Sequence, residues 1–412
     1  MATVRDSDTL STCFLDQPPS CLQFCPTAPD FLVIGTYLLT VDKSDADAAS
    51  PPSSRSGSLQ LFRLNPQSYH LSQLQRLQLP HAIFDLQFAL HDPSLFAIAL
   101  SAGEVLFYRI DISPEGPAAG VSIHFLNTLT VREDDTKLGL FLAWVPPQSL
   151  GGDDGNFPTV GFAISFSDGQ VSVFQKDKSS PTIQQETMNE TCLAGMPIEV
   201  WYLAFHKRGD GQLALFSGDD FNQVRGFTFN NDPDFHVEYP PLNDRGKNHD
   251  GGVTAILPLC NEDGGSIILT GSYDQHVRVY QFGTHRKVLA SMDLGGGVWR
   301  LKAIKVDGKA MELPSQGREG RVVRSYVILA SCMHGGARII RVTSSKDPNI
   351  GTVWDIKIVA QFTEHDSMNY ASDVWMNYDH QDPMTTDSRQ PKLLCVSSSF
   401  YDKRVCVWQA NL

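Results

Sequence analysis

Short apolar runs alternate with polar turns along the chain, and the same arrangement returns from end to end. The clearest copies are SFSDGQVSVF, GSYDQHVRVY and SFYDKRVCVW, where a turn aspartate is followed by apolar residues at constant offsets. These aspartates are Asp168, Asp274 and Asp402. Apolar runs such as VGFAISF and IILTGS precede the turns. Runs of this length on both sides of a tight turn predict two β-strands joined as a hairpin.

Four weaker copies complete the repeat. Ala102 and His334 hold the turn position in ALSAGEVLFY and CMHGGARII, and Asp220 holds it in SGDDFNQVRGF with one extra residue. The peptide GSLQLF preserves the strand that follows a turn. Regularly spaced self-similarity is the signature of repeat architectures. Seven such units without a helical period predict an all-β chain, folded over residues 1–412 as a single seven-bladed β-propeller of WD repeats.

The last unit reaches Leu412 directly after its third strand, so its outer edge lacks a partner from its own repeat. Native sheets avoid unpaired edges. The segment TLSTCFLD near the N-terminus precedes the strands of the first blade. We therefore expect this segment to supply the missing strand and to close the ring.

Two polar inserts interrupt the repeat. Residues 42–57, DKSDADAASPPSSRSG, are rich in Ser, Ala, Pro and charge, which predicts a disordered turn insertion within the first blade. Residues 230–250 are rich in Asn, Asp and Pro, which predicts a long loop between the fourth and fifth blades.

The composition excludes several classes of protein. A formal charge of -13 over 412 residues disfavours a broad phosphate-binding surface, so we expect no nucleic-acid partner. No apolar run approaches the ~20 residues that span a bilayer, and residues 1–20 lack the pattern of a signal peptide. We expect a soluble monomer without a membrane partner, located in the cytoplasm, with the nucleus as a second location. The scattered cysteines do not suggest zinc, and we expect no metal and no cofactor.

Familiar enzyme motifs are absent from the sequence: it contains no GxSxG elbow, HExxH pair, P-loop or GxGxxG fingerprint. Propellers commonly present ring-shaped surfaces to partner proteins. From the residues alone, a non-catalytic scaffold for a protein complex is therefore the default interpretation.

Turn aspartates and nearby histidines have a structural explanation that is favoured over a catalytic one. In WD repeats the turn aspartate usually binds a histidine of the neighbouring loop, and His249 and His365 occupy that partner position. For His365 the preference is weaker, so it stays a candidate for substrate binding. His334 stands where the repeat template has aspartate. It is followed by two glycines in the peptide CMHGG, and glycines allow a close approach of the backbone. Because histidine titrates near neutrality, His334 is a candidate general base.

Candidate binding residues gather where the innermost strand of each blade begins, which is one mouth of a propeller's channel. Four ionisable residues take this position: Asp85, Glu199, Arg300 and Asp373. Four aromatic residues lie beside them: Trp201, Trp299, Tyr370 and Trp375. Core packing is the alternative explanation for the rings. Acidic groups among aromatic faces suit a quaternary ammonium ligand, through cation–π attraction.

Several peptides resemble one known family: SGDD (217–220), LTGSYDQHVRVY (269–280), GGGVWRLK (295–302), LASCMHGGARII (329–340), EHDSMNYASDVW (364–375) and SSSFYDKRVCVW (397–408). They are similar to the WD-repeat diphthine methyl-ester hydrolases, formerly labelled diphthine methyltransferases. The resemblance covers the C-terminal half well, whereas the N-terminal half agrees in its blade pattern and in EVWYLAF. The GVWR, CMHGG and SFYD peptides are more specific than a generic WD repeat.

The resemblance implies a carboxylic-ester hydrolase of diphthamide biosynthesis. Its substrate would be methylated diphthine on a histidine of translation elongation factor 2, and its products diphthine and methanol. In this interpretation His334 is the base that activates water, and Asp373 or Glu199 orients this base. Arg300, or the backbone amides of the GGG and HGG loops, receives the oxyanion. The trimethylammonium group of diphthine is assigned to a set of six residues: Trp299, Trp201, Tyr370, Trp375, Asp85 and His365.

Overall fold

The computed structural model describes residues 5–41, 53–113, 120–146, 161–176, 183–184, 188–193, 195–230, 236–283, 285–306, 309–310, 322–376 and 392–412. These ranges contain β-strands and no helix. Consequently no helix in them is long and apolar enough to cross a membrane. Seven of their sheets have four or five strands each, and the fold is a seven-bladed β-propeller, as the repeat predicts.

The described residues divide into two compact units, and the first contains Thr12–Val200 and Ser399–Val405. Its first blade consists of β3 (Pro19–Cys25), β4 (Ala28–Thr36), β6 (Ser53–Leu64) and β7 (Leu71–Leu79), with β5 (Leu38–Val41) also paired to β6. The second consists of β8 (Ile83–Phe88), β9 (Leu95–Leu100), β10 (Glu104–Ser113) and β11 (Gly120–Thr130). The third consists of β12 (Gly139–Trp144), β13 (Gly161–Phe166), β14 (Val171–Lys176) and β15 (Met188–Leu193).

The second unit contains Met1–Ser11, Trp201–Ser398 and Cys406–Leu412. Blade four consists of β16 (Val200–Lys207), β17 (Leu213–Asp219), β18 (Val224–Phe229) and β19 (Val237–Asn243). Blade five consists of β20 (Val253–Glu262), β21 (Gly265–Ser272), β22 (His276–Gly283) and β23 (Lys287–Asp293). Blade six consists of β24 (Arg300–Ala303), β27 (Val322–Ser331), β28 (Ala337–Asp347) and β29 (Gly351–Phe362). A small hairpin, β25 (Lys305–Val306) and β26 (Lys309–Ala310), follows β24.

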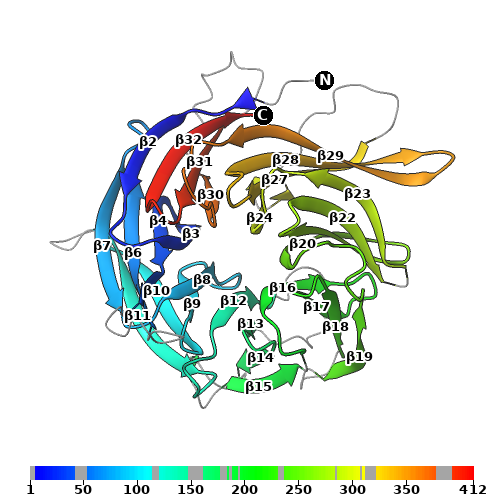
Figure 1. Ribbon diagram of the computed structural model, residues 1–412, viewed down its shortest axis with the longest axis horizontal. Helices are drawn as coiled ribbons and strands as arrows, with labels where there is room; N and C mark the ends of the chain where they lie inside the picture. The colour runs from blue at the N-terminus through cyan, green and yellow to red at the C-terminus, as the bar shows by residue number, and fades with distance from the viewer. Residues whose placement is uncertain are drawn as a thin grey trace, which may run out of the picture. The chain divides into compact units, whose positions relative to one another are not determined.

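The two ends of the chain meet in the seventh blade. Its sheet has the order β2 (Thr9–Phe14), β32 (Arg404–Asn411), β31 (Lys392–Ser399) and β30 (Ser372–Trp375), and Figure 1 shows β2 beside β32. The short β1 (Arg5–Asp6) also pairs in parallel with β29 of blade six. The prediction that TLSTCFLD supplies the missing strand is therefore confirmed.

The two polar inserts differ in part from their predictions. Residues 42–52 lie outside the described residues, but Ser53–Gly57 belong to β6, where Ser53–Ser56 pair with β5. Ladder hydrogen bonds to β5 compensate for the lack of apolar side chains there. In the second insert, residues 231–235 lie outside the described residues, whereas Val237–Asn243 form the outer strand of blade four. Its prolines are tolerated because the strand lies at the edge of the sheet.

Histidines stabilise blades five and seven from within. The imidazole Nε2 of His249 lies 2.8 Å from the Thr270 hydroxyl, and that of His365 lies 2.7 Å from the Ser397 hydroxyl. The expected partnership of turn aspartate and histidine takes another form in blade five. There, Asp274 accepts a hydrogen bond from the Asp250 amide at 2.8 Å and forms an ion pair with Arg278 at 2.8 Å. The structural explanation of Asp274 is supported, with an arginine as its charged partner.

Deleting residues 1–16 removes β1 and β2 and leaves the edge of β32 unpaired. We expect the midpoint of thermal unfolding to fall by several degrees, because each lost ladder hydrogen bond contributes about 1 kcal/mol. A deletion of residues 1–4 removes neither strand and serves as the control. Equal midpoints for the two deletions, measured by circular dichroism, would contradict closure by β2.

His249 should make the fold sensitive to acid. Burial lowers the pKa of its imidazole to about 4; Arg278 adds to this effect and Asp274 opposes it. The unfolded chain, with a histidine pKa near ~6.5, takes up the proton first as the pH falls. Stability on the order of 3 kcal/mol is therefore present at neutral pH and lost as the pH falls from about 7 to about 4.

The measurement is urea unfolding of the wild type and of His249→Gln across this pH range. Glutamine keeps a polar group near Thr270 but does not titrate, so the advantage of the wild type should shrink toward acid. A difference between the two proteins that stays constant with pH would rule out this role of His249.

Candidate functional site

The four predicted ionisable residues do stand at the starts of first strands. Asp85 is near the beginning of β8, Glu199 directly precedes β16, Arg300 begins β24, and Asp373 is the second residue of β30. Asp85 and Glu199 belong to the first unit, whereas Arg300 and Asp373 belong to the second. The contacts that build a candidate site lie within the second unit.

Four aromatic rings form a cluster in this unit, and we call Trp201, Tyr273, Trp299 and Tyr370 the aromatic cluster. Trp299 is its centre: its ring centroid lies 5.5 Å from that of Trp201, 6.0 Å from that of Tyr273 and 5.2 Å from that of Tyr370. The Trp201 and Tyr273 rings also meet edge to face at 6.2 Å. All four residues are half-buried, so the cluster keeps part of its aromatic surface accessible.

Charged groups flank the aromatic cluster. The Arg300 guanidinium lies 4.6 Å from the centroid of the Trp299 ring, and its Nη1 donates to the Trp299 carbonyl at 2.9 Å. The Trp201 indole Nε1 donates to the Asp220 carboxylate at 2.8 Å. One face of Trp299 is thus occupied by a cation of the protein itself. A ligand cation would be favoured near Trp201, where Asp220 supplies negative charge.

A close backbone contact holds two glycine-rich segments together. A Cβ atom on Gly296 would lie 2.1 Å from the Cys332 carbonyl oxygen and 2.6 Å from the Gly335 nitrogen. One on Gly297 would lie 2.7 Å from the Met333 sulfur. Real Cβ atoms do not approach so closely, so only glycine allows the loop 295–297 to rest on the turn 332–336.

His334 lies at the tip of that turn. The turn is closed by hydrogen bonds from the Gly335 amide to the Cys332 carbonyl, at 2.7 Å, and from Gly336 to Met333, at 3.1 Å. His334 is exposed, and its ring has no hydrogen-bond partner among the described residues. Met333 pairs through its backbone with Asn369, the residue before Tyr370. The main chain of His334 is therefore joined closely to the aromatic cluster.

Two buried amides lie in the same contact. Gly296 and Gly297 are buried, and within the described part of the chain their N–H groups have no acceptor. Buried backbone donors are nearly always paired in native proteins. Two buried donors without a protein acceptor among the described residues therefore lie where the loop 295–297 meets the turn 332–336.

Asp373 is the most buried carboxylate near these segments. Its side chain is 2% exposed and forms an ion pair with the Lys302 amine at 2.5 Å. Its Oδ1 also accepts a hydrogen bond from the Val374 amide at 2.7 Å. The negative charge of Asp373 is thus balanced by a lysine that lies two residues after Arg300 on β24, on the same face of the strand.

Other predicted site residues have contacts elsewhere. His365 binds Ser397, and its ring meets Phe362 edge to face at 5.0 Å. Asp85 is buried and accepts a hydrogen bond from the Leu142 amide at 3.0 Å, which joins β8 to β12. Glu199 and Trp375 are half-buried at the starts of their blades. The structure brings Trp201, Trp299, Tyr370 and Arg300 together, with His334 in the adjoining turn.

Three members of the site were not predicted from the sequence: Tyr273, Asp220 and Lys302. Tyr273 directly precedes the turn residue Asp274, and Asp220 had been considered only as a turn former. Lys302 could have been predicted from its position two residues after Arg300, because residues two apart on a strand project to the same face. Neither ring packing nor the indole hydrogen bond of Trp201 leaves a pattern in the sequence.

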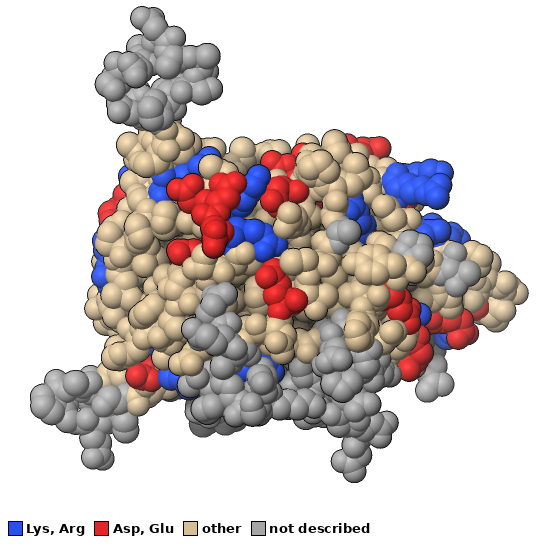
Figure 2. Space-filling model, turned by 90° about the horizontal axis from the view of Figure 1, so that it is seen from below, with Lys and Arg blue, Asp and Glu red and all other residues tan. Residues whose placement is uncertain are grey.

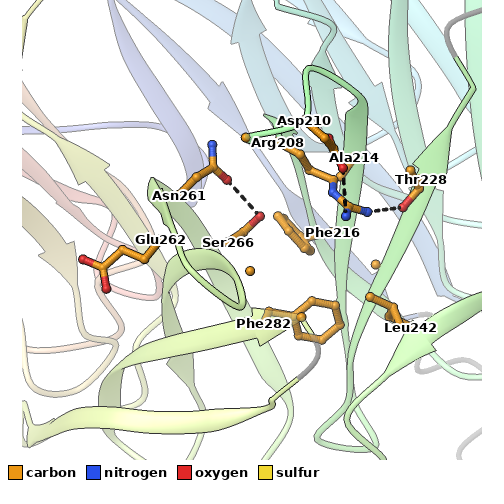
Figure 3. A pocket seen from close by; sticks show the side chains of 14 residues that line it. Arg208, Asp210, Ala214, Phe216, Thr228, Leu242, Asn261, Glu262, Ser266 and Phe282 are labelled. Atoms are coloured by element: carbon orange, nitrogen blue, oxygen red, sulfur yellow. Dashed lines mark hydrogen bonds and ion pairs between the residues drawn. The ribbon is translucent and has the colours of Figure 1, made fainter. Parts of the chain in front are cut away.

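Two further observations limit the site. Among the described residues, no group of three or more His, Cys, Asp and Glu side chains has the arrangement of a metal site. A separate cavity of about 190 Å³ is lined by residues of blades four and five, and its lining includes the rings of Phe216 and Phe282 (Figure 3). Its rim carries the Arg208–Asp210 ion pair, at 3.1 Å. None of the predicted site residues lines this cavity.

The chain is similar in sequence to several curated proteins of one name. No protein-family model matches the chain. A protein of Schizosaccharomyces pombe named diphthine methyltransferase is 27% identical over 97% of both chains. The Saccharomyces cerevisiae protein of that name is 24% identical over 99% of this chain and 100% of its own. The human protein of that name is 23% identical over 85% of this chain and 71% of its own.

Solved structures support the fold alone. The crystal structure of Saccharomyces cerevisiae Sqt1 has a TM-score of 0.54 at 11% identity and covers 98% of this chain and 99% of its own. Chaetomium thermophilum Sqt1, bound to the N-terminus of the ribosomal protein L10, has a TM-score of 0.52 at 13% identity and covers 98% of this chain and 100% of its own. The chain is thus similar, over nearly its whole length, to proteins of several eukaryotes that are named diphthine methyltransferase, and this similarity supports the diphthamide-biosynthesis family of WD-repeat proteins.

Proposed function

We propose that the protein acts in diphthamide biosynthesis and hydrolyses the methyl ester of methylated diphthine on translation elongation factor 2. The names of its relatives support diphthine as the substrate. The observation that carries the proposal is the half-buried aromatic cluster beside the exposed turn of His334. Such a reaction would take place in the cytoplasm, where the elongation factor works.

The cationic end of the substrate fits the aromatic cluster. Diphthine carries a trimethylammonium group, which cannot donate hydrogen bonds and is bound well by aromatic faces. Trp201 and Tyr273 offer such faces, and Asp220 adds a carboxylate 2.8 Å from the Trp201 nitrogen. Arg300 lies over one face of Trp299, at 4.6 Å, so the cation would bind the other face of Trp299 together with the Trp201 ring.

The ester end fits the glycine contact. In the proposed reaction, water adds to the ester carbonyl carbon while the His334 imidazole takes its proton. The carbonyl oxygen becomes an oxyanion, which can accept hydrogen bonds from the buried N–H groups of Gly296 and Gly297. Collapse breaks the bond to the methoxy oxygen, which leaves as methanol with the proton from His334. The carboxylate remains on the substrate.

Asp373 and Glu199 are assigned different roles in the proposed reaction. Asp373 is already neutralised by Lys302, so we assign it a positioning role within blades six and seven. Glu199 belongs to the other compact unit, and its part as an alternative partner of the base rests on sequence alone. Trp375, half-buried on β30, stays a proposed contact for the substrate.

A non-catalytic scaffold is the second candidate, because the sequence lacks every familiar hydrolase motif. The name of the relatives also raises methyl transfer as a third reaction. All three alternatives differ in what happens to one methyl group of the substrate, which makes the mass of the factor the decisive readout.

His334→Ala should abolish the reaction. With purified methylated elongation factor, the wild type should remove one methyl mass, and the variant should be slower by about 10²- to 10⁴-fold, the usual contribution of a general base. Because the side chain is exposed, the melting temperature should change little. His124→Ala, an exposed histidine of blade two, is the matched control.

Three results would count against this assignment. Full activity of His334→Ala removes the residue from the mechanism. No loss of methyl mass with the wild type favours the scaffold, and a gain of methyl mass favours methyl transfer.

Trp299→Leu tests the aromatic cluster separately. Leucine keeps apolar volume but has no π face, so the trimethylated substrate should bind about 2- to 30-fold more weakly, which corresponds to ~0.5 to 2 kcal/mol. A mimic without methyl groups on the nitrogen should lose much less. Equal losses for both ligands, measured by calorimetry, would indicate that Trp299 acts through packing.

A further inference from the structure

A second surface of the same unit carries an unusual concentration of positive charge. An open hollow of about 670 Å³ lies between the loop after β19 and the hairpin that joins β22 to β23. We call it the basic hollow, and four of its lining residues are cations: Arg245, Lys247, Arg286 and Lys287. His285 lies among them. None of these residues belongs to the aromatic cluster or to the glycine contact.

The cations of the basic hollow are not balanced by acidic neighbours. All four are exposed, and none forms an ion pair with a carboxylate among the described residues. The lining includes one acid, Asp244, which is buried and whose Oδ1 accepts hydrogen bonds from the Val224 and Gly246 amides. The positive charges therefore exceed the negative ones at this surface.

The two walls of the hollow are joined. The Arg286 guanidinium Nη1 donates to the Asn243 carbonyl at 3.0 Å, which connects the β22–β23 hairpin of blade five to the end of blade four. This contact holds cations from two blades around one space. Like charges gathered in this way repel one another, so the cluster is most stable when an anion lies between them.

We propose that the basic hollow docks a short acidic segment of a protein partner. Arginine forms paired hydrogen bonds with carboxylates, and the two lysines add point charges that tolerate different spacings. A chain with a net charge of -13 gains selectivity from such a site, because its remaining surface repels acidic segments. This docking surface is separate from the proposed reaction and does not depend on it.

Charge distribution favours an acidic peptide over a nucleic acid. Nucleic acids present continuous phosphates and are bound by extended basic surfaces. The basic hollow has only four full cations, from two loops. On the face shown in Figure 2, acidic and basic side chains are interspersed and form no broad basic field. A few carboxylates match the extent of the basic hollow better than a polynucleotide does.

The test is binding of a fluorescein-labelled oligoglutamate peptide to the full chain, followed by anisotropy at low salt. Lys247→Glu/Lys287→Glu should weaken binding by at least about 10-fold, because each reversal replaces attraction with repulsion. The control, Lys346→Glu/Lys357→Glu, makes the same change of charge on the β28–β29 hairpin and should stay within about 2-fold of the wild type.

Three outcomes would overturn the proposal. Equal weakening in the two double variants would mean that only net charge matters. Displacement of the peptide by inorganic phosphate at equal charge concentration would indicate a phosphate site. Tighter binding of a labelled RNA oligonucleotide, lost selectively in Lys247→Glu/Lys287→Glu, would assign the hollow to nucleic acid.

Discussion

The contact between the loop 295–297 and the turn 332–336 is the constraint on which the candidate site depends. A single added methyl group at Gly296 would come within 2.1 Å of a carbonyl oxygen, so the two segments touch only through glycine. The loop leads directly into Trp299, and the turn presents His334. One backbone contact thus links the aromatic cluster, which we propose binds a cation, to the turn that carries the proposed base. It also leaves the Gly296 and Gly297 amides buried without protein acceptors among the described residues.

Two surfaces of the same unit, the candidate site and the basic hollow, differ in how their charges are compensated. At the candidate site Lys302 pairs with Asp373, and Arg300 lies against the Trp299 ring. The Asp220 carboxylate accepts a hydrogen bond from the neutral Trp201 indole and keeps its negative charge, which suits the cationic end of the proposed substrate. In the basic hollow the cations stay uncompensated, which suits recognition of a charged partner by long-range attraction. Recognition of a large protein and chemistry on one side chain are thereby assigned to different surfaces.

Much of the fold could be predicted because the repeat records where each hairpin turns. Asp168, Asp274 and Asp402 mark turns between strands, and TLSTCFLD supplies the closing strand. Two strands were harder to predict from the sequence, because β19 contains two prolines and β6 begins with serines. These strands form because they pair with a neighbouring strand, and not because of their side-chain pattern. At the site, position along the first strands indicated Trp201, Trp299 and Arg300. Tyr273 was missed because it contacts Trp201 and Trp299, which come from two other blades, and sequence spacing does not reveal such contacts. His365 and Asp85 proved to bind Ser397 and Leu142, partners that sequence spacing does not reveal.

The central claim is that this site adds water to an ester carbonyl. The most direct test is to carry out the reaction in heavy-oxygen water and to weigh the modified peptide of the elongation factor. Hydrolysis at the carbonyl predicts a product that has lost one methyl group and carries one heavy oxygen in its carboxylate. A demethylated product without heavy oxygen, or a methyl ester that stays intact, would contradict the account.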